Sequence, residues 1–183
     1  IAIEPDTGII TDCALTKASG PDNHEAVVGL ALLQEEPAGV RVLGDSAYGT
    51  GAARATLAEL KHVAVIKPLP LRAPVPGGFT SDDFAIDFDA RTVTCPAGHT
   101  VNIAPKGGAR FEKHCRTCPL RAQCTTASRG RNLTISEHEP LLRAARAAAR
   151  TPRWRDEYRQ HRPMVERSIA WLTRGNRKVR YRG

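Results

Sequence analysis

Residues 40–68, VRVLGDSAYGTGAARATLAELKHVAVIKP, decide the fold class of this chain. Two short apolar runs, 40–43 and 62–66, flank a stretch at 52–60 whose composition is typical of a helix. A strand, a helix and a second strand in this order predict a mixed α/β sheet with helices. The loop at 44–49 follows the first strand directly, so we expect Asp45 to project from the edge of that sheet.

The residues before this unit predict a hairpin and a further helix. Residues 1–4 and 9–15 are predicted to be strands joined by the turn Pro-Asp-Thr-Gly at 5–8. Cys13 is expected to lie in the second strand with its side chain in the protein core. Residues 24–36 carry apolar side chains at helical spacing, and Pro-Ala-Gly at 37–39 ends the helix. The chain starts inside an expected strand, which suggests that an N-terminal part of the protein precedes it.

Composition places the chain among globular proteins. It has 183 residues, of which 41% are hydrophobic and 25% charged, enough apolar residues for one ordinary domain or one domain with a small insertion. No apolar run approaches the roughly 18 residues of a membrane span, and the first residues lack the pattern of a signal peptide. We therefore expect a cytoplasmic protein without a membrane partner.

The positive charge of the chain is concentrated at its C-terminal end. The net charge is +8, and residues 150–183 hold eleven basic against three acidic residues, so the preceding part is balanced. Ten of the eleven are arginines, whose guanidinium groups suit bidentate contacts to phosphate. This segment predicts a nucleic-acid partner. A solvated basic helix with a tail is the alternative.

The composition changes at Leu69, where a stretch rich in proline and glycine opens a module with four of the five cysteines. Residues 84–88 and 92–95 predict a small β-hairpin there. Helices return at 139–149 and, after Thr151 and Pro152, from residue 153 onward, with a potential break at Pro163. The module has few large apolar residues, so we expect it to lack a convincing core of its own.

The cysteines of this module have a spacing typical of metal ligands. Cys115 and Cys118 form a Cys-x2-Cys pair, Cys124 follows, and Cys95 lies on the preceding hairpin. Thiolates at this spacing favour a structural zinc ion, which would contribute folding energy to a small module. One of the two histidines His99 and His114 is an alternative ligand. Reduced thiols without metal are the other interpretation.

Two acidic residues are candidates for chemistry. Asp45 follows a strand, although most aspartates in such loops bond only to their own turn. Tyr158, Arg162 and Glu166 recur every four residues and share one helical face. An acid among arginines makes chemical sense when a divalent metal lies between it and a phosphodiester. The alternative is a salt-bridged surface helix in which Arg162 pairs with Glu166.

Taken together, residues 42–50, the cysteine module and YRQHRPMVERSIAWLTR at 158–174 resemble the C-terminal half of bacterial DDE-type insertion-sequence transposases, in a branch with a cysteine-containing insertion. The resemblance implies a ribonuclease-H-like α/β fold, formed by residues 1–68 and by closing helices with a basic tail at 138–183. Residues 69–137 would be a small β-rich, zinc-binding insertion. It further implies metal-dependent cleavage and strand transfer of DNA in the bacterial cytoplasm, at the nucleoid.

The resemblance also implies roles for single residues. Asp45 corresponds to the second catalytic Asp and Glu166 to the Glu, and both would bind two Mg²⁺ or Mn²⁺ ions. The partner would be double-stranded DNA, the element ends and the target, with self-association on DNA. The expected DNA contacts are Tyr158, Arg162, Arg167, Arg174, Arg177, Lys178 and Arg180.

The first catalytic Asp has no counterpart in the chain, because Asp6 lies in a turn and Asp12 lies outside the expected pattern. We therefore expect the isolated chain to bind DNA and to cleave it poorly or not at all. The alternative is a zinc-stabilised DNA-binding protein without catalysis, or a decayed transposase remnant. A basic protein-interaction module is a third interpretation.

Overall fold

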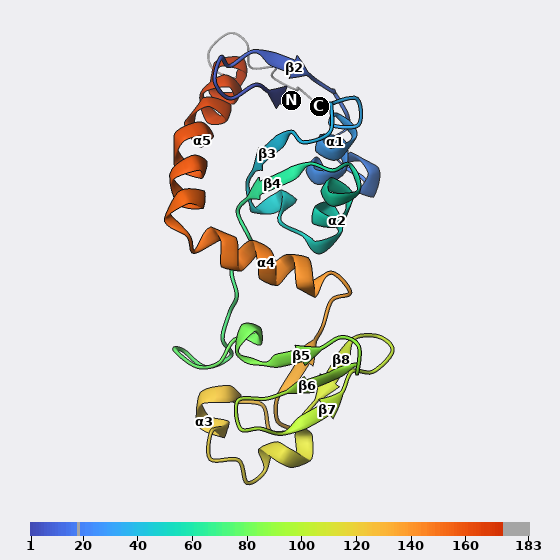
Figure 1. Cartoon of the computed structure of the whole chain (residues 1–183), viewed down its shortest axis with the longest axis vertical. Helices are drawn as coiled ribbons and strands as arrows, with labels where there is room; N and C mark the ends of the chain where they lie inside the picture. The colour runs from blue at the N-terminus through green and yellow to red at the C-terminus, as the bar shows by residue number, and fades with distance from the viewer. Residues whose placement is uncertain (18, 174–183) are drawn as a thin grey trace, which may run out of the picture. The chain divides into compact units, whose positions relative to one another are not determined.

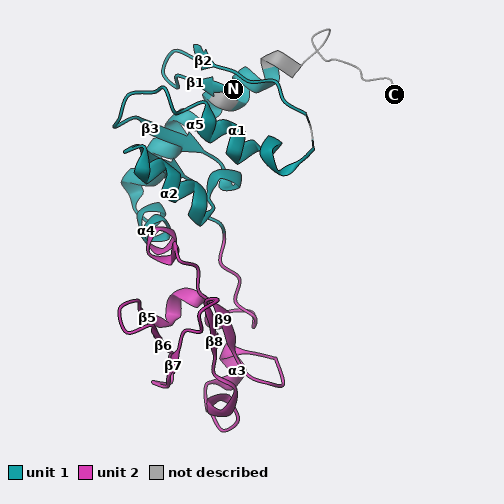
Figure 2. Cartoon of the chain, turned by 90° about the vertical axis from the view of Figure 1, so that its right-hand side faces the viewer, with its two compact units in different colours: residues 1–69, 144–183 teal, residues 70–143 magenta. Residues whose placement is uncertain are grey.

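The computed structural model describes residues 1–17 and 19–173. The chain forms two compact units, shown in Figure 2: unit 1 comprises residues 1–69 and 144–183, and unit 2 comprises residues 70–143. Both helices and small sheets are present, so the fold is mixed α/β. No helix within the described ranges is long and apolar enough to cross a membrane.

Unit 1 is built around the predicted strand, helix and strand, which the structure confirms. β3 and β4 are parallel, and Arg41 to Gly44 pair in register with Val63 to Ile66. The connecting helix α2 begins where the Thr50 hydroxyl accepts the amide of Ala53, and it buries Leu57. The elements of unit 1 are β1 (Ala2–Ile3), β2 (Ile10–Asp12), η1 (Pro21–Asn23), α1 (Glu25–Ala31), β3 (Arg41–Gly44), η2 (Ser46–Tyr48), α2 (Gly51–Glu59), β4 (Val63–Ile66) and α5 (Pro152–Thr173) (Figure 1).

The N-terminal hairpin is confirmed, but it is shorter than expected and forms its own sheet. β1 and β2 pair antiparallel, and in the described residues they are not joined to β3 and β4. The expectation that Cys13 lies in a strand in the core is wrong. β2 ends at Asp12, whose Oδ1 accepts the amide of Cys13 at 2.7 Å, and the Cys13 side chain is exposed.

The helix expected at 24–36 is also shorter. α1 begins after His24, whose Nδ1 accepts the amide of Ala26 at 3.3 Å, and it ends at Ala31. Beyond that point the amides of Leu33 and Gln34 bond to carbonyls three residues back, as in turns. The apolar residues at helical spacing therefore extend beyond Ala31, where the helical hydrogen bonds end.

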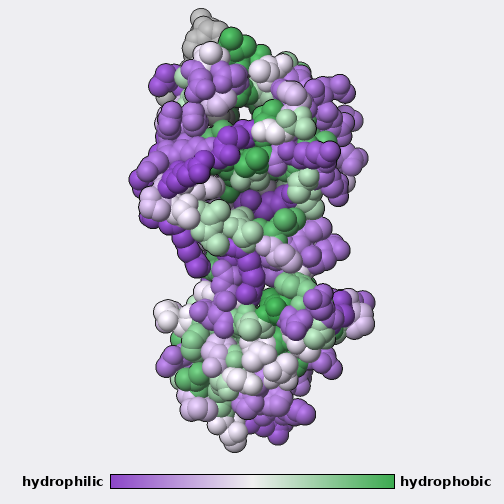
Figure 3. Space-filling model, viewed as in Figure 1, coloured by the Kyte–Doolittle hydropathy of each residue, from purple (hydrophilic) through white to green (hydrophobic). Residues whose placement is uncertain are grey.

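The helix α5 is one continuous element of 22 residues. It begins where the Thr151 hydroxyl accepts the amide of Trp154 at 3.3 Å, with Pro152 in its first turn, as predicted. The helix does not break at Pro163, although a proline removes one backbone hydrogen bond. α5 packs against β3 and β4, and its side of unit 1 is largely hydrophilic in Figure 3.

Unit 2 has more structure than the predicted hairpin. That hairpin is present as β5 and β6, and β7 adds a third antiparallel strand, while β8 and β9 form a second sheet. The elements of unit 2 are η3 (Ser81–Asp83), β5 (Ala85–Asp87), β6 (Thr92–Thr94), β7 (Thr100–Asn102), β8 (Gly108–Arg110), η4 (Glu112–Cys115), α3 (Arg121–Cys124) and β9 (Asn132–Thr134). Helix α4 (Glu139–Ala149) runs from unit 2 into unit 1.

The expectation that this module lacks a core of its own is wrong. Phe84 and Phe111 are fully buried, with ring centres 5.5 Å apart, and the side chains around them come from widely separated strands and turns. Two cysteines take part in the same buried cluster: Phe84, Val93, Ile103, Ala109, Phe111, Cys115, Cys124, Leu133 and Ile135. Three strands contribute one of these residues each, and the others come from turns and short helices, which is why no single segment appeared apolar enough.

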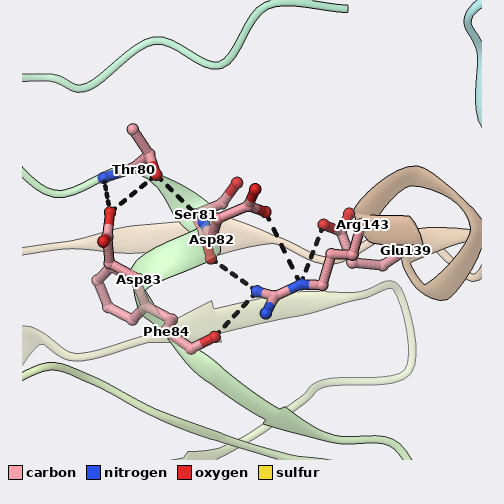
Figure 4. Close-up of polar contacts among 7 residues, drawn as sticks. All are labelled: Thr80, Ser81, Asp82, Asp83, Phe84, Glu139 and Arg143. Carbon is pink, nitrogen blue, oxygen red and sulfur yellow. Dashed lines mark hydrogen bonds and ion pairs between the residues drawn. The ribbon is translucent and has the colours of Figure 1, made fainter. Parts of the chain in front are cut away.

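Arg143, at the end of unit 2 in α4, holds the start of the module in place (Figure 4). Its guanidinium donates to the carbonyls of Ser81 and Phe84 at 2.7 and 2.9 Å. It also forms ion pairs with Glu139 and Asp82, at 3.4 and 3.9 Å. One side chain thus connects the first and last parts of the unit.

Candidate functional site

Asp45 lies directly after β3 and caps the short helix η2. Its Oδ1 accepts the amide of Ala47 at 2.7 Å, the bond to its own turn that the alternative interpretation predicted. Its Oδ2 points elsewhere and lies 4.0 Å from a terminal nitrogen of Arg162. The side chain remains 42% exposed, so a ligand from solvent can reach the carboxylate.

The ring of Tyr48 holds the turn that carries Asp45. A side chain at Gly29 of α1 would place its Cβ 2.5 Å from Tyr48 Cε1, and one at Gly44 would lie 3.3 Å from Cδ2. The two glycines therefore leave the space that the ring fills. Burial, and then the nearby Glu25, raise the pKa of Tyr48 to about 12. The Tyr48 hydroxyl donates to Glu25 Oε1 at 3.4 Å.

The expected face of α5 lies opposite Asp45. Arg162 Nε donates to Glu166 Oε1 at 3.1 Å, the ion pair that the alternative interpretation predicted. Burial raises the pKa of the Tyr158 hydroxyl. The positive charge of Arg162 lowers this pKa, whereas the carboxylates of Asp45 and Glu166 raise it further. The structure thus brings Asp45, Tyr158, Arg162 and Glu166 together, with one guanidinium between two carboxylates.

Contacts at three points fix α5 against the rest of unit 1. Arg41 of β3 makes a bidentate pair with Glu157, at 2.5 and 2.6 Å. His161 Nδ1 lies 3.4 Å from Asp6 in the β1–β2 turn. One turn further along, the sulfur of Met164 lies 2.9 Å from the position that a side chain at Gly8 would occupy. Asp6 lies in the turn between β1 and β2, as the sequence predicted, and there it faces His161.

The carboxylate pair by itself is an incomplete site for a divalent metal. In residues 1–17 and 19–173, no three His, Cys, Asp or Glu side chains are arranged to hold a metal ion. Asp45 and Glu166 supply hard oxygen ligands of the kind that Mg²⁺ prefers, and a third carboxylate is not among the described neighbours. Arg162 supplies the positive charge between them.

The four cysteines of unit 2 line one small cavity. Cys95, Cys115, Cys118 and Cys124 border it together with His99 and His114, whose rings stack at 4.8 Å. The sulfurs are not arranged as a ready metal site in the described residues, and all five cysteines of the chain are free thiols. Burial raises the pKa of the Cys124 thiol, the other three thiols raise it further, and Arg131 lowers it.

Arg131 and Trp154 border the two sites, and sequence reasoning did not single them out. Arg131 is buried, its guanidinium lies 5.6 Å from the centre of the Phe84 ring, and its backbone amide donates to Cys115 Sγ at 3.4 Å. Trp154 stacks on Tyr158 with ring centres 5.0 Å apart. The four-residue spacing of Trp154 and Tyr158 signals that contact, whereas no sequence signal connects Arg131 with the cysteines.

The remaining predicted DNA contacts are less defined. Arg167 is exposed on α5, one residue beyond Glu166. Arg174, Arg177, Lys178 and Arg180 lie outside the described residues.

Comparison with known proteins identifies one family. Residues 94–183, just under half of the chain, match the family described as Transposase DDE domain. The matched segment includes all four cysteines of unit 2 and the Tyr158 to Glu166 face of α5, whereas Asp45 precedes it. No curated protein and no solved structure matches the chain. The match supports a DDE transposase, an enzyme class that acts on DNA.

Proposed function

We propose that this chain is the C-terminal part of a DDE-type insertion-sequence transposase, which cleaves DNA strands at the element ends and joins them to a target. Residues 1–68 and 138–183 would form a ribonuclease-H-like catalytic domain, and residues 69–137 an insertion. The observation that carries the proposal is that Asp45 and Glu166, far apart in the sequence, approach the same Arg162 guanidinium. The match of residues 94–183 to a transposase domain supports it independently.

In this proposal Asp45 and Glu166 hold divalent metal. Two Mg²⁺ or Mn²⁺ ions bound there would stabilise the attacking and leaving oxygens of an in-line phosphodiester displacement. Arg162 is placed to move from the carboxylates to a phosphate when metal is bound, and Arg167, exposed on the same helix, would neutralise further phosphate charge. Tyr158 borders the same face. The basic residues Arg174, Arg177, Lys178 and Arg180 would hold the duplex backbone away from the reacting bond.

A third carboxylate would come from outside the described residues. Within the described residues, β1 and β3 each pair with a single strand, and both border a cavity of ≈ 350 Å³ whose other wall is Gly29 of α1 and the turns that follow it. A further strand between them would end near Asp45. For this reason we expect the chain by itself to bind DNA and to cleave it poorly. Self-association on DNA and action at the bacterial nucleoid, in the cytoplasm, complete the proposal.

Calorimetric titration of the chain with Mn²⁺ tests the carboxylate pair. Asp45→Asn keeps the oxygen that caps η2, and Glu166→Gln keeps the length of the side chain, so both variants should fold. We expect each to weaken Mn²⁺ binding at least about tenfold, the effect of losing 1.4 kcal/mol of binding free energy. Matched controls are Asp89→Asn and Glu59→Gln, both at exposed positions and neither among the residues of the site.

Two outcomes would contradict the proposal. One is an unchanged Mn²⁺ affinity in Asp45→Asn and Glu166→Gln. The other is magnesium-dependent DNA cleavage by the chain that survives Asp45→Ala. If the chain binds duplex DNA and the full-length protein, with its third carboxylate, shows no metal-dependent cleavage that Asp45→Asn or Glu166→Gln abolishes, the non-catalytic DNA-binding protein or decayed remnant replaces the enzyme. A protein-interaction module would show no salt-dependent affinity for DNA.

We also propose a structural zinc ion in unit 2, held by Cys95, Cys115, Cys118 and Cys124. The support is chemical: four thiols border one cavity, an amide donates to Cys115 Sγ, and a buried guanidinium is available to balance thiolate charge. The stacked pair of His99 and His114 lies at the same cavity and offers a replacement ligand. Because the unit also has a buried apolar cluster, the binding free energy of the zinc would add to the stability that this cluster supplies.

Elemental analysis of the purified chain tests this second proposal. We expect one zinc per chain, a loss of zinc in Cys118→Ser and no loss in Cys13→Ser, because Cys13 is an exposed thiol of unit 1. Well under one zinc per chain in the unmodified protein would end the proposal and leave reduced thiols.

A further inference from the structure

An open groove on unit 2 lies away from the cysteine cavity. Its volume is ≈ 750 Å³, and β7, β8, β9 and the turn at 104–107 form its walls. We call it the β7–β9 groove. The lining residues that matter below are Asn102, Lys106, Gly108, Arg110, Asn132 and Thr134.

The alternation of the two strands explains why these side chains face solvent. Ala109 of β8 and Leu133 of β9 are buried in the core of unit 2. Their neighbours Arg110, Asn132 and Thr134 therefore project to the opposite face, where all three are exposed. Arg110 lies opposite Asn132 in the antiparallel register. The core determines which face is polar.

The groove is positively charged. Lys106 and Arg110 line it, no acidic residue does, and neither cation forms an ion pair or a side-chain hydrogen bond within the described parts of the chain. An adjoining cavity that shares Lys106 contains Glu137, whose carboxylate lies 3.6 Å from His138. The amides of Asn102 and Asn132 and the hydroxyl of Thr134 add neutral hydrogen-bonding groups. This combination is suited to phosphate and sugar oxygens.

The floor of the groove is open backbone. Gly108 lies in β8 opposite Thr134, and a Cβ added there would meet no atom within 4 Å. No side chain of unit 2 therefore occupies the space next to the Gly108 Cα on this face. A glycine inside a strand often marks a place where a ligand backbone approaches closely.

We propose that the β7–β9 groove binds the phosphodiester backbone of duplex DNA, so that unit 2 contributes a DNA contact of its own besides α5 and the basic C-terminal segment. The choice of DNA over an acidic protein rests on the proposed function. Lys106 and Arg110 neutralise two phosphates, and the neutral side chains set the position of the strand.

The test is the binding of a labelled 20-base-pair duplex, followed by fluorescence anisotropy across a range of salt concentrations. Each phosphate neutralised contributes about 0.9 to the slope of log K against log salt, so Lys106→Ala with Arg110→Ala should lower the slope by about 1.8. The matched control, Lys113→Ala with Arg129→Ala, removes the same charges at exposed positions outside the groove. We expect the control to keep the original slope.

A third variant separates the groove from net charge. Gly108→Val fills the floor without removing charge, and valine suits a strand, so the melting temperature should not fall. We expect it to lower the slope as the double variant does, because phosphates can no longer approach the cations.

Each outcome has a distinct meaning. If the wild type binds duplex DNA and all variants keep its slope, the groove proposal is wrong and the proposed function stands. If groove and control variants lose the same slope, the effect is net charge and the groove proposal is wrong. If the wild type binds no duplex DNA, both fail, and poly-glutamate bound through Lys106 and Arg110 would identify an acidic protein as the partner.

Discussion

Replacing Gly29 with alanine tests how the turn that carries Asp45 is held. The new methyl carbon would lie 2.5 Å from Cε1, 2.7 Å from the hydroxyl oxygen and 3.0 Å from Cζ of Tyr48. On its other side the ring passes close to the backbone of Gly44, where an added Cβ would lie 3.3 Å from Cδ2. The substitution must therefore displace either the ring or α1.

Two opposing effects determine the change in stability. Overpacking of this kind costs about 1–3 kcal/mol. Alanine in place of glycine inside a helix stabilises by about 0.5–1 kcal/mol. We therefore expect Gly29→Ala to lower the free energy of unfolding by about 1 kcal/mol, within a range of about 0–2.5 kcal/mol.

In a Tyr48→Leu background, the effect of Gly29→Ala on the free energy of unfolding should change sign. Tyr48→Leu removes the three atoms that the methyl would meet, so Gly29→Ala in that background should raise the free energy of unfolding by about 0.5–1 kcal/mol. The coupling between the two positions should be about 1–3 kcal/mol. Urea unfolding followed by tryptophan fluorescence measures it, because both tryptophans of the chain belong to unit 1.

A coupling below about 0.5 kcal/mol, the usual limit of additivity, would refute the reasoning. It would mean that the Tyr48 ring does not occupy the space left by Gly29. The same variants connect to the proposed chemistry, because Tyr48 and Asp45 belong to one short turn. Gly29→Ala should weaken Mn²⁺ binding at Asp45, and the Tyr48→Leu background should remove this dependence.

Three further predictions follow from contacts in both units. The hydrogen bond from Arg41 lowers the pKa of Glu157, so this ion pair stabilises the fold above the ordinary carboxyl pKa and the stabilisation is lost as the pH falls. In Glu157→Gln, the change in the free energy of unfolding between neutral and acidic pH, measured by urea unfolding, should be smaller by about 0.5 kcal/mol. Absorbance titration at high pH should show one tyrosine with a pKa of about 12, which is absent in Tyr48→Phe. Because Tyr48 ionises more easily in the unfolded chain, the free energy of unfolding should fall between pH 10 and 12. Gly107→Ala should destabilise unit 2 by more than about 1 kcal/mol in thermal unfolding, since φ is +80° and the new Cβ would lie 2.3 Å from the Ile135 carbonyl oxygen.

The sequence by itself determined the local elements around the site. The strand, helix and strand at 40–68, the two hairpins and the start of α5 after Thr151 all follow from short-range patterns, and each is present. The shared face of Tyr158, Arg162 and Glu166 is of the same kind, because helical spacing alone puts side chains four residues apart side by side. Such patterns report the backbone within a few residues.

The tertiary structure decided what those elements contact. Asp45 meets Arg162, Tyr48 fills the space at Gly29, and Arg131 reaches the cysteine cavity, and each contact joins residues from distant parts of the chain. Burial is decided in the same way: the core of unit 2 collects single side chains from three strands and several from turns and short helices, whereas Cys13 in an apolar run stays exposed. The physical reason is that burial and charge pairing depend on which elements pack together, and a pattern along one segment does not contain the position of its partners.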